Sequence, residues 1–291
     1  MRLLTNRKMQ TLLFPVLVLA WMVPCLIALA QTNNVQGSPP LPSFVIKVAT
    51  TPIMLSPDAT SDQPAINLMR NVVAASGGLH AWSQVRSAKA LYTSVDSHNA
   101  PHRSLLLDDW SSTNVRYCRG HEGSNVTRLH HDGRSSFNTS VNGKARQVPE
   151  FDQARILAHH IPAAAAEVIL RTSSYLLKTV PNSECAQGYS CVDVYRRLSP
   201  HGPYLKEQEW ELSSSSGLPD TIKLRLPDVL RGTKEIWESL SLRDYANKSS
   251  ILVPHTIIAH MPGGSTQTRR LASINFGVPF DMQAFDKEVA Q

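Results

Sequence analysis

Residues 204–212 and 219–226 each alternate apolar and polar side chains. Successive side chains of a β-strand point to opposite faces, so the alternation predicts two half-buried strands. The apolar face of the pair carries Tyr204, Trp210, Leu212, Ile222, Leu224 and Leu226. The opposite face carries the charged residues Glu207, Glu209, Glu211, Lys223 and Arg225. We therefore predict a hairpin that turns one face toward an apolar interior.

The loop between these strands predicts their register. Ser215, Ser216 and Gly217 fit a three-residue loop with Gly217 in the left-handed region, which only glycine enters cheaply. This loop pairs Trp210 with Ile222 on the inner face. On the outer face it sets two pairs of opposite charges, Glu209 with Lys223 and Glu207 with Arg225.

Similar patterns recur along most of the chain. We predict strands at 87–98, 103–110, 113–119, 124–131, 135–148, 174–180, 190–198, 204–212, 219–226, 233–245, 251–261 and 267–277. Turn signals such as Asp132-Gly133 and Asn142-Gly143 mark several of the turns between strands. A twisted sheet of about ten to twelve strands rarely stays flat, so it should curl into a half-barrel.

Two stretches favour helices. Asp62 or Ser61 can cap a helix that has Pro64 in its first turn and ends at Gly77-Gly78. Residues 151–173 are alanine-rich and predict one or two helices, broken at Pro162. The fold class is therefore α+β, a large curled antiparallel sheet wrapped around a few helices.

The first thirty residues have the layout of a signal peptide. Arg2, Arg7 and Lys8 precede an apolar run, which ends in Ala28-Leu29-Ala30. A membrane anchor is the alternative, but two prolines and the small residues before Gln31 favour cleavage there. We expect a periplasmic or secreted protein that starts near Gln31, with no integral membrane span after cleavage.

The remaining chain divides by composition. Residues 31–61 are rich in Pro, Ser and Thr and predict a linker, which leaves 62–291 as one half-barrel domain. Removal of residues 1–30 takes away three basic residues and no acidic ones, so the formal charge falls from +6 to +3. No basic stripe with interleaved aromatic residues remains, so we expect no nucleic-acid partner.

Cys185 and Cys191 flank a short loop between two predicted strands. In an exported chain this spacing favours a local disulfide, because the alternative zinc site would lack a second pair of ligands. Cys118 is then left as a free, buried thiol.

No pattern predicts an enzyme. The histidines at 130–131, 159–160, 255 and 260 lack metal-ligand spacing, and no nucleophile elbow or phosphate-binding loop is present. The three glutamates of the hairpin could line a glycosidase cleft, but their pairing with basic residues favours a solvated outer face. We expect no catalytic residue, no metal and no cofactor.

The order of elements resembles a known family. The stretch VVAASGGLHAWSQVRS, the helical insert, WELSSSSGLPDTIKLRL, and ILVPHTIIAH before INFGVPFD are similar to the LolA/LolB lipoprotein-carrier superfamily, in particular to exported outer-membrane lipoprotein-sorting-like proteins. The resemblance spans about residues 64–286. It implies an antiparallel half-barrel around helices, an apolar cavity that holds acyl chains, and no covalent chemistry.

We therefore expect an exported carrier for a lipid, an acylated peptide or another apolar small molecule. Its pocket, partly closed by the helices of 151–173, should have apolar walls and need no charged anchor. The expected lining residues are Leu106, Trp110, Trp210, Ile222 and Leu224. The alternative is a non-enzymatic envelope protein with a structural or partner-binding role, in which tryptophans such as Trp110, Trp210 and Trp237 are core filler.

Overall fold

The computed structural model describes residues 53–95, 101–109, 116–122, 125–131, 136–139, 145–148, 153–197, 199–226, 236–279 and 281. Residues 1–52, with the predicted signal peptide and most of the predicted linker, lie outside this part. The helices are α1 (Gln63–Ala75), α2 (Gly78–Gln84), α3 (Gln153–Ala158) and α4 (Pro162–Arg171). The strands β1 to β7 are Met54–Leu55, Ser87–Val95, Pro101–Asp109, Arg116–Glu122, Asn125–His131, Ser136–Thr139 and Ala145–Val148. The strands β8 to β14 are Tyr175–Thr179, Tyr189–Arg197, Tyr204–Ser213, Pro219–Leu226, Ile236–Lys248, Ile251–His260 and Thr266–Phe276.

All these strands form one antiparallel sheet. Its order is β7-β6-β5-β4-β3-β2-β14-β13-β12-β11-β10-β9-β8, and β1 pairs with β10. The sheet has fourteen strands, more than expected, because residues 135–148 form two strands and Met54–Leu55 adds one. Residues 54–55 of the predicted linker are therefore part of the sheet.

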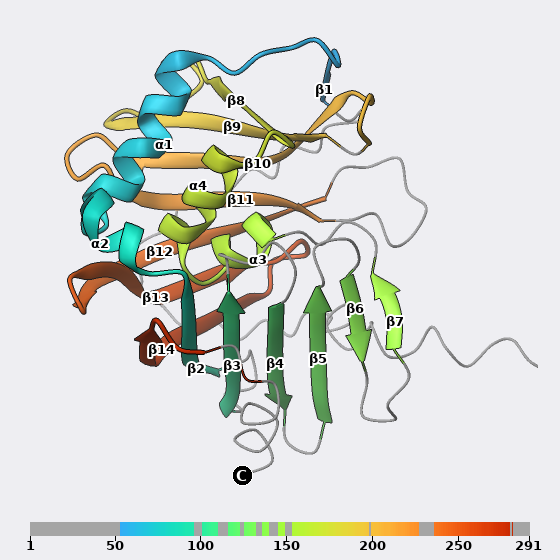
Figure 1. The fold of residues 1–291 in the computed structure, drawn as a ribbon, viewed down its shortest axis with the longest axis vertical. Coiled ribbons are helices and arrows are strands. Elements are labelled where there is room, and N and C mark those ends of the chain that lie inside the picture. Colours follow the sequence, from blue (N-terminus) through green and yellow to red (C-terminus); the bar gives the residue numbers. More distant parts are fainter. Residues whose placement is uncertain are drawn as a thin grey trace, which may run out of the picture. The chain divides into compact units, whose positions relative to one another are not determined.

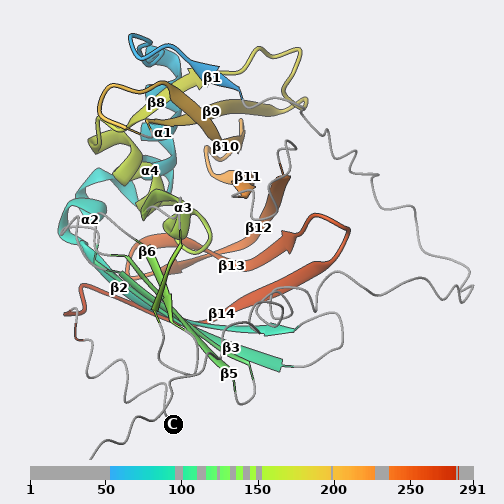
Figure 2. The same cartoon turned by 90° about the vertical axis from the view of Figure 1, so that its right-hand side faces the viewer.

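The sheet curls around the helices, which confirms the predicted architecture. Helices α1, α3 and α4 lie over one face of the sheet (Figure 1), and Figure 2 shows the sheet bending around them, with β8 and β9 at one end and β2 and β3 at the other. We call the face that the helices cover the concave face. The first and last strands of the order, β7 and β8, are edges, so the sheet is a half-barrel.

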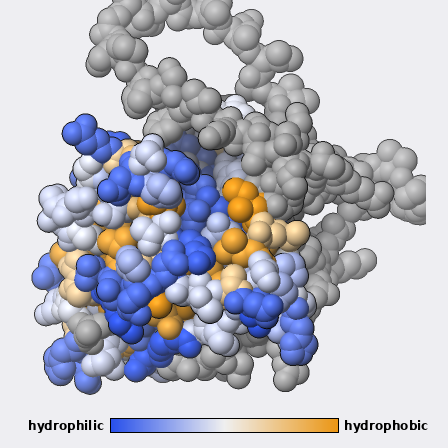
Figure 3. Space-filling model, turned by 90° about the horizontal axis from the view of Figure 1, so that it is seen from above, coloured by the Kyte–Doolittle hydropathy of each residue, from blue (hydrophilic) through white to orange (hydrophobic). Residues whose placement is uncertain are grey.

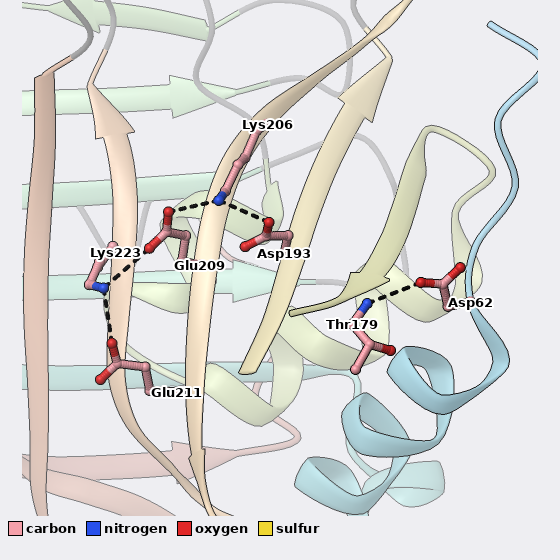
Figure 4. A network of polar contacts seen from close by, with 7 residues as sticks. All are labelled: Asp62, Thr179, Asp193, Lys206, Glu209, Glu211 and Lys223. Atoms are coloured by element: carbon pink, nitrogen blue, oxygen red, sulfur yellow. Dashed lines mark hydrogen bonds and ion pairs between the residues drawn. The ribbon is translucent and has the colours of Figure 1, made fainter. Parts of the chain in front are cut away.

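The start of α1 is fixed to the sheet and not by a side-chain cap. Asp62 makes no capping hydrogen bond to the helix. Its carboxylate accepts a hydrogen bond from Lys178 Nζ at 2.8 Å. It also accepts one from the backbone N–H of Thr179 at 3.2 Å, which Figure 4 shows. The bond from Lys178 is the main reason that the pKa of Asp62 lies below its ordinary value. The neighbouring Ser61 Oγ accepts from the N–H of Leu177, so this segment joins α1 to β8.

The β10–β11 hairpin has the predicted register. Trp210 pairs with Ile222, and Glu209 pairs with Lys223 and accepts a hydrogen bond from its Nζ. The predicted three-residue loop is wrong, because Ser213 N–H bonds to Leu218 O, and four residues lie between this bonded pair. A bulge near Leu212 absorbs the extra loop residue and preserves the register beyond it.

A second bulge overturns part of the predicted face assignment. The pairing of β10 with β9 shifts between Lys206 and Gln208, so residues before the bulge change faces relative to Trp210. Glu207 therefore does not pair with Arg225 on the outer face. It is buried and accepts two hydrogen bonds from Arg196, at 2.7 and 2.8 Å.

Tyr204 was predicted to face the interior with Trp210 and is also displaced by this bulge. It packs with Leu176 and Tyr195 in a small separate cluster. Arg197 lies over its ring, with the guanidinium carbon 4.4 Å from the ring centroid.

The outer face of β9, β10 and β11 carries a chain of ion pairs (Figure 4). Lys206 Nζ lies 2.9 Å from Asp193 and 2.8 Å from Glu209, and Lys223 Nζ joins Glu209 at 3.2 Å to Glu211 at 2.9 Å. Burial acts to raise the pKa of Glu209, but the two lysines outweigh it and hold this pKa below its ordinary value. The charges therefore bind the three strands on the face opposite Trp210.

The predicted disulfide between Cys185 and Cys191 is present, with the two Cα atoms 5.8 Å apart. It joins the start of β9 to the loop before it, and Val180 N–H bonds to Cys191 O beside it. Cys118 pairs with Leu106 in the β3–β4 register, but its side chain lies outside the described part, so its free thiol stays a prediction.

The surface seen from above in Figure 3 mixes hydrophilic residues with several separate hydrophobic areas. Among the described residues, the large hydrophobic side chains that are exposed are Ile53 and Met54. Both lie at β1, where Ile53 O accepts a hydrogen bond from Lys206 N–H.

We predict that Gly217→Val lowers the free energy of unfolding by about 1 to 2 kcal/mol, because a β-branched residue would be forced to a positive φ. Gly217 has φ 73°, and an added Cβ would meet only ordinary contacts, the nearest at 3.5 Å from Ala75 Cβ. Chemical denaturation measures the change. Ser214→Val, in the same loop at an exposed position without positive φ, is the control, and equal losses in both variants would contradict the backbone explanation.

Candidate functional site

Four of the five predicted lining residues lie together on the concave face. Leu106, Trp210, Ile222 and Leu224 are each 0% exposed and belong to one core cluster with residues of α1, α3 and α4. Trp110 lies outside the described residues. The four side chains are therefore covered by helices in this structure.

Trp237 does not share this face. On β12, Trp237 is the neighbour of Glu238. Glu238 and Leu240 are two residues apart and share one face, and Leu240 belongs to the concave core. Trp237 is thus placed on the opposite face by strand alternation, and it is half-buried. The Nε1–H of Trp210, by contrast, donates to Gln208 Oε1 at 2.8 Å inside the core.

The cover over the concave face contains a run of small residues between larger apolar ones, among them Leu157 of α3 and Ile169 of α4. As predicted, the helical segment breaks at Pro162, which starts α4. The four alanines that follow, Ala163–Ala166, are all buried. Helix α3 is short, and every one of its six residues is buried, including the charged Arg155.

A polar cluster occupies the concave side where α3 ends. His159 Nδ1 lies 3.4 Å from Arg269 Nη2, and its Nε2 lies 3.6 Å from Glu238 Oε2. Arg269 on β14 and Glu238 on β12 are 8% and 5% exposed. These residues come from three elements that are distant in sequence, and with Arg155 they place several charges inside the half-barrel. We call Arg155, His159, His160, Glu238 and Arg269 the inner polar cluster.

His160 is held from the other side of the cluster. Tyr92 Oη donates to the backbone oxygen of His160 at 3.0 Å, and the two rings lie 5.0 Å apart between centroids. The exposed fraction of His160 is 6%, and its Nδ1 has no hydrogen-bond partner among the described residues. Ser94 pairs with Arg269 across β2 and β14, and its buried hydroxyl likewise lacks a hydrogen-bond partner in the described part.

The electrostatics of the cluster favour neutral imidazoles. Burial, followed by the positive charge of Arg269, holds the pKa of both histidines well below its ordinary value, and Arg155 adds to this effect at His159. Burial also raises the pKa of Glu238, although Arg269 and Arg155 partly oppose that shift. The contact between His159 and Glu238 is therefore a close approach of a neutral ring to a carboxyl group. The two arginines are the fixed charges of the site.

This cluster corrects the prediction of uncharged walls, and the sequence did contain a signal for it. On β12, Glu238 falls at the same alternating positions as the apolar Leu240 and Leu242. On β14, Arg269 does the same with Leu271. A charged residue at an apolar position of a half-buried strand is unusual enough to predict a buried polar site.

The described residues contain no group of three or more His, Cys, Asp or Glu side chains that could hold a metal ion. Within the same residues, no helix is long and apolar enough to cross a membrane.

Several solved structures are similar to this chain, among them two from the superfamily that the sequence resembles and one from a further family. A putative outer membrane lipoprotein-sorting protein domain from Vibrio parahaemolyticus is 11% identical over 78% of this chain and 98% of its own, with a TM-score of 0.46. A LolA superfamily protein from Nitrosomonas europaea is 10% identical over 77% and 98%, with a TM-score of 0.49. A DUF1329 family protein from Desulfovibrio piger is 9% identical over 80% and 100%, with a TM-score of 0.45.

No protein-family model matches the chain, and no curated protein matches its sequence. At identities of 9 to 11%, ligand and activity have to be inferred from the residues of this chain.

We predict that the protein loses stability as the pH falls from 6.5 to 5. The folded pKa values of His159 and His160 lie well below 6.5, so the unfolded chain binds more protons in this range. Each histidine then removes up to about 1.4 kcal/mol of unfolding free energy per pH unit. Glu238 acts in the opposite direction, because its folded pKa is raised, and offsets part of the loss.

Denaturant unfolding at several pH values measures this slope. The double variant His159→Gln, His160→Gln should flatten it between pH 6.5 and 5, whereas His201→Gln, at an exposed turn residue, should leave it unchanged. A slope that is the same in the double variant and in the unmodified protein would show that the two histidines are not its source.

Proposed function

We propose that this protein is an exported, non-enzymatic carrier that holds an acyl chain or a similar apolar ligand between the concave face of its half-barrel and helices α3 and α4. The observation that carries the proposal is the contrast between these two surfaces. The sheet contributes a broad apolar floor, and the first half of helix α4 above it contributes four buried alanines.

The apolar floor extends over many strands. Its buried residues from β9 to β14 and from β2 and β3 include Val192, Val194, Trp210, Leu212, Ile222, Leu224, Leu240, Leu242, Ile257, Ala259, Leu271, Ala90 and Leu106. The register places five of them in one row across the strands, in the order Val192, Trp210, Ile222, Leu240 and Ala259. Neighbouring strands lie about 4.8 Å apart, so this row spans roughly 19 Å, the scale of a long acyl chain.

The cover is easier to displace than a core of large side chains. Burying a Leu, Ile or Phe side chain stabilises by about 1.5 to 3 kcal/mol, but a single methyl group contributes only about 0.8 kcal/mol. Ala163–Ala166 therefore contribute little energy per residue, and the larger buried side chains of α4 are Val168 and Ile169 near its end. The α3–α4 segment also carries charged or polar residues, with Arg155 in α3, His159 in the turn between the helices and Arg171 at the end of α4.

One observation favours the alternative role, an envelope protein with a self-filled barrel. Leu106, Trp210, Ile222 and Leu224 have no exposed surface, so a ligand reaches them only when α3 and α4 move away. The two roles differ in what happens when an apolar chain is offered, and ligand binding therefore decides between them.

We predict that a delipidated sample binds long-chain fatty acids, with a change in tryptophan emission and a rise in melting temperature. Trp82 and Trp210 are both buried, at 1% and 0% exposure, so displacement of the helices changes their surroundings. Phospholipids and acylated peptides are tested in parallel. If none of these compounds changes either signal, the carrier proposal fails and the self-filled barrel is the better description.

Replacing the alanines of α4 one at a time by Leu sharpens this test. A leucine that enters the ligand space should weaken binding at least about tenfold and leave stability nearly unchanged, whereas a leucine forced into a filled core costs about 1 to 3 kcal/mol. Arg171→Leu, at an exposed position of the same helix, is the matched control. Destabilisation by all four leucines, without any effect on ligand binding, would support the self-filled barrel.

Export is the second part of the proposal. The charged start, apolar run and small residues before Gln31 support cleavage, and a disulfide between Cys185 and Cys191 fits an oxidising compartment. We predict that exported protein begins at Gln31, which N-terminal sequencing checks. An intact Met1 in the membrane fraction would instead identify residues 1–30 as an anchor.

A further inference from the structure

We propose that the ligand carries an anionic head and that Arg269, assisted by Arg155, binds this head at the inner polar cluster. The shared chemistry is one oxyanion, a carboxylate or a phosphate, attached to a long apolar chain. This inference rests on the proposed carrier function and adds the chemical class of the ligand to it.

The charge of the cluster is the first reason. Arg155 and Arg269 are positive and Glu238 is its acidic member, while the two histidines are neutral. Burial raises the pKa of Glu238 and so favours its neutral form, which balances the charge of Arg269 less well than a carboxylate does. A buried guanidinium is costly away from water, so a bound anion would stabilise Arg269.

The unfilled hydrogen-bonding capacity of Arg269 is the second reason. Its Nε has no hydrogen-bond partner among the described residues, although only 8% of Arg269 is exposed. Its Nη2 instead lies at a long 3.4 Å from His159 Nδ1. A guanidinium binds a carboxylate or phosphate through two parallel N–H donors, which a ring nitrogen cannot match.

The position of Arg269 is the third reason. Arg269 pairs with Ile257 of β13, which pairs in turn with Leu242 of β12. Arg269 therefore shares the concave face with these two apolar residues of the floor. The row that ends at Ala259 lies one inward-facing position away on β13. A chain lying along that row brings its head to Arg269.

An oxyanion can replace His159 as the hydrogen-bond acceptor of Arg269. His159 lies between Arg269 and Glu238, because its Nδ1 approaches the arginine and its Nε2 approaches the carboxyl group. An oxyanion that takes the place of His159 at Arg269 also has to move His159, which lies in the turn between α3 and α4. Binding of the head would thereby displace the helices that cover the apolar floor.

The test compares sixteen-carbon ligands that differ only in the head. Palmitate and hexadecyl phosphate are anionic, hexadecanol and palmitamide are neutral, and hexadecylamine is cationic. We expect the delipidated protein to bind at least one anionic ligand about tenfold or more tightly than either neutral one, with the amine weakest. The relative affinities of palmitate and hexadecyl phosphate distinguish a carboxylate from a phosphate head.

The variant Arg269→Gln should remove most of this preference and retain binding of hexadecanol. Arg270→Gln is the matched control, because Arg270 is the next residue on β14 and is exposed. It should bind all five ligands as the unmodified protein does. If Arg269→Gln does not fold, the comparison of heads in the unmodified protein still decides the question.

The outcomes separate the two proposals. Equal affinity for anionic and neutral chains would overturn the anionic head and leave the carrier function intact. Failure to bind any of the five chains would overturn the carrier function itself. A preference for anions that persists in Arg269→Gln would show that this arginine is not the binding group.

Discussion

The connection between β7 and β8 is the constraint on which the interior depends. These two strands lie at opposite edges of the sheet, although they follow each other in sequence. The chain starts the main sheet at β2, near its middle, reaches one edge at β7, and returns from the other edge through β8 to β14, which pairs with β2. The segment between β7 and β8 therefore has to cross the sheet, and α3 and α4 lie on the concave face because they are that crossing (Figure 1).

This crossing explains the composition of the helical segment. A helix that lies on a curled sheet and also packs against a second helix has little surface left for solvent, and Ala163–Ala166 of α4 are accordingly all buried. The same placement carries Arg155 and His159 into the interior, where they meet Glu238 and Arg269 from the far strands. The apolar cover and the inner polar cluster are therefore consequences of one topology.

The sequence predicted the parts of this fold that depend on local patterns. Strand alternation and the Gly217 turn were enough to predict the pairing of Trp210 with Ile222, and the spacing of Cys185 and Cys191 was enough to predict their disulfide. The loop length and the partner of Glu207 could not be predicted, because each bulge shifts the pairing by one residue without leaving a gap in the alternation.

The assembly of the inner polar cluster from several elements could not be predicted for a different reason. Its members come from three separate stretches, residues 155–160, 238 and 269, and only the order of the strands brings β12 and β14 under the end of α3. Alternation alone could have marked Glu238 and Arg269 as charged residues at apolar positions. Their mutual approach to His159 depends on the crossing, which no local pattern encodes.

The same cluster bears on the choice between a carrier and a self-filled barrel. In a core that serves only stability, apolar side chains of similar volume often replace buried charges without loss, and in some proteins with a gain in stability. Here the apolar floor is closely packed at Trp210 and Ile222, yet beside it Arg269 keeps an unused donor and His160 an unused ring nitrogen among the described residues. A barrel filled by its own side chains gains nothing from these groups. A barrel that opens for an amphiphile gains a partner for the head at one end of the floor that holds the chain, and the charged residues then have a function that packing alone does not give them.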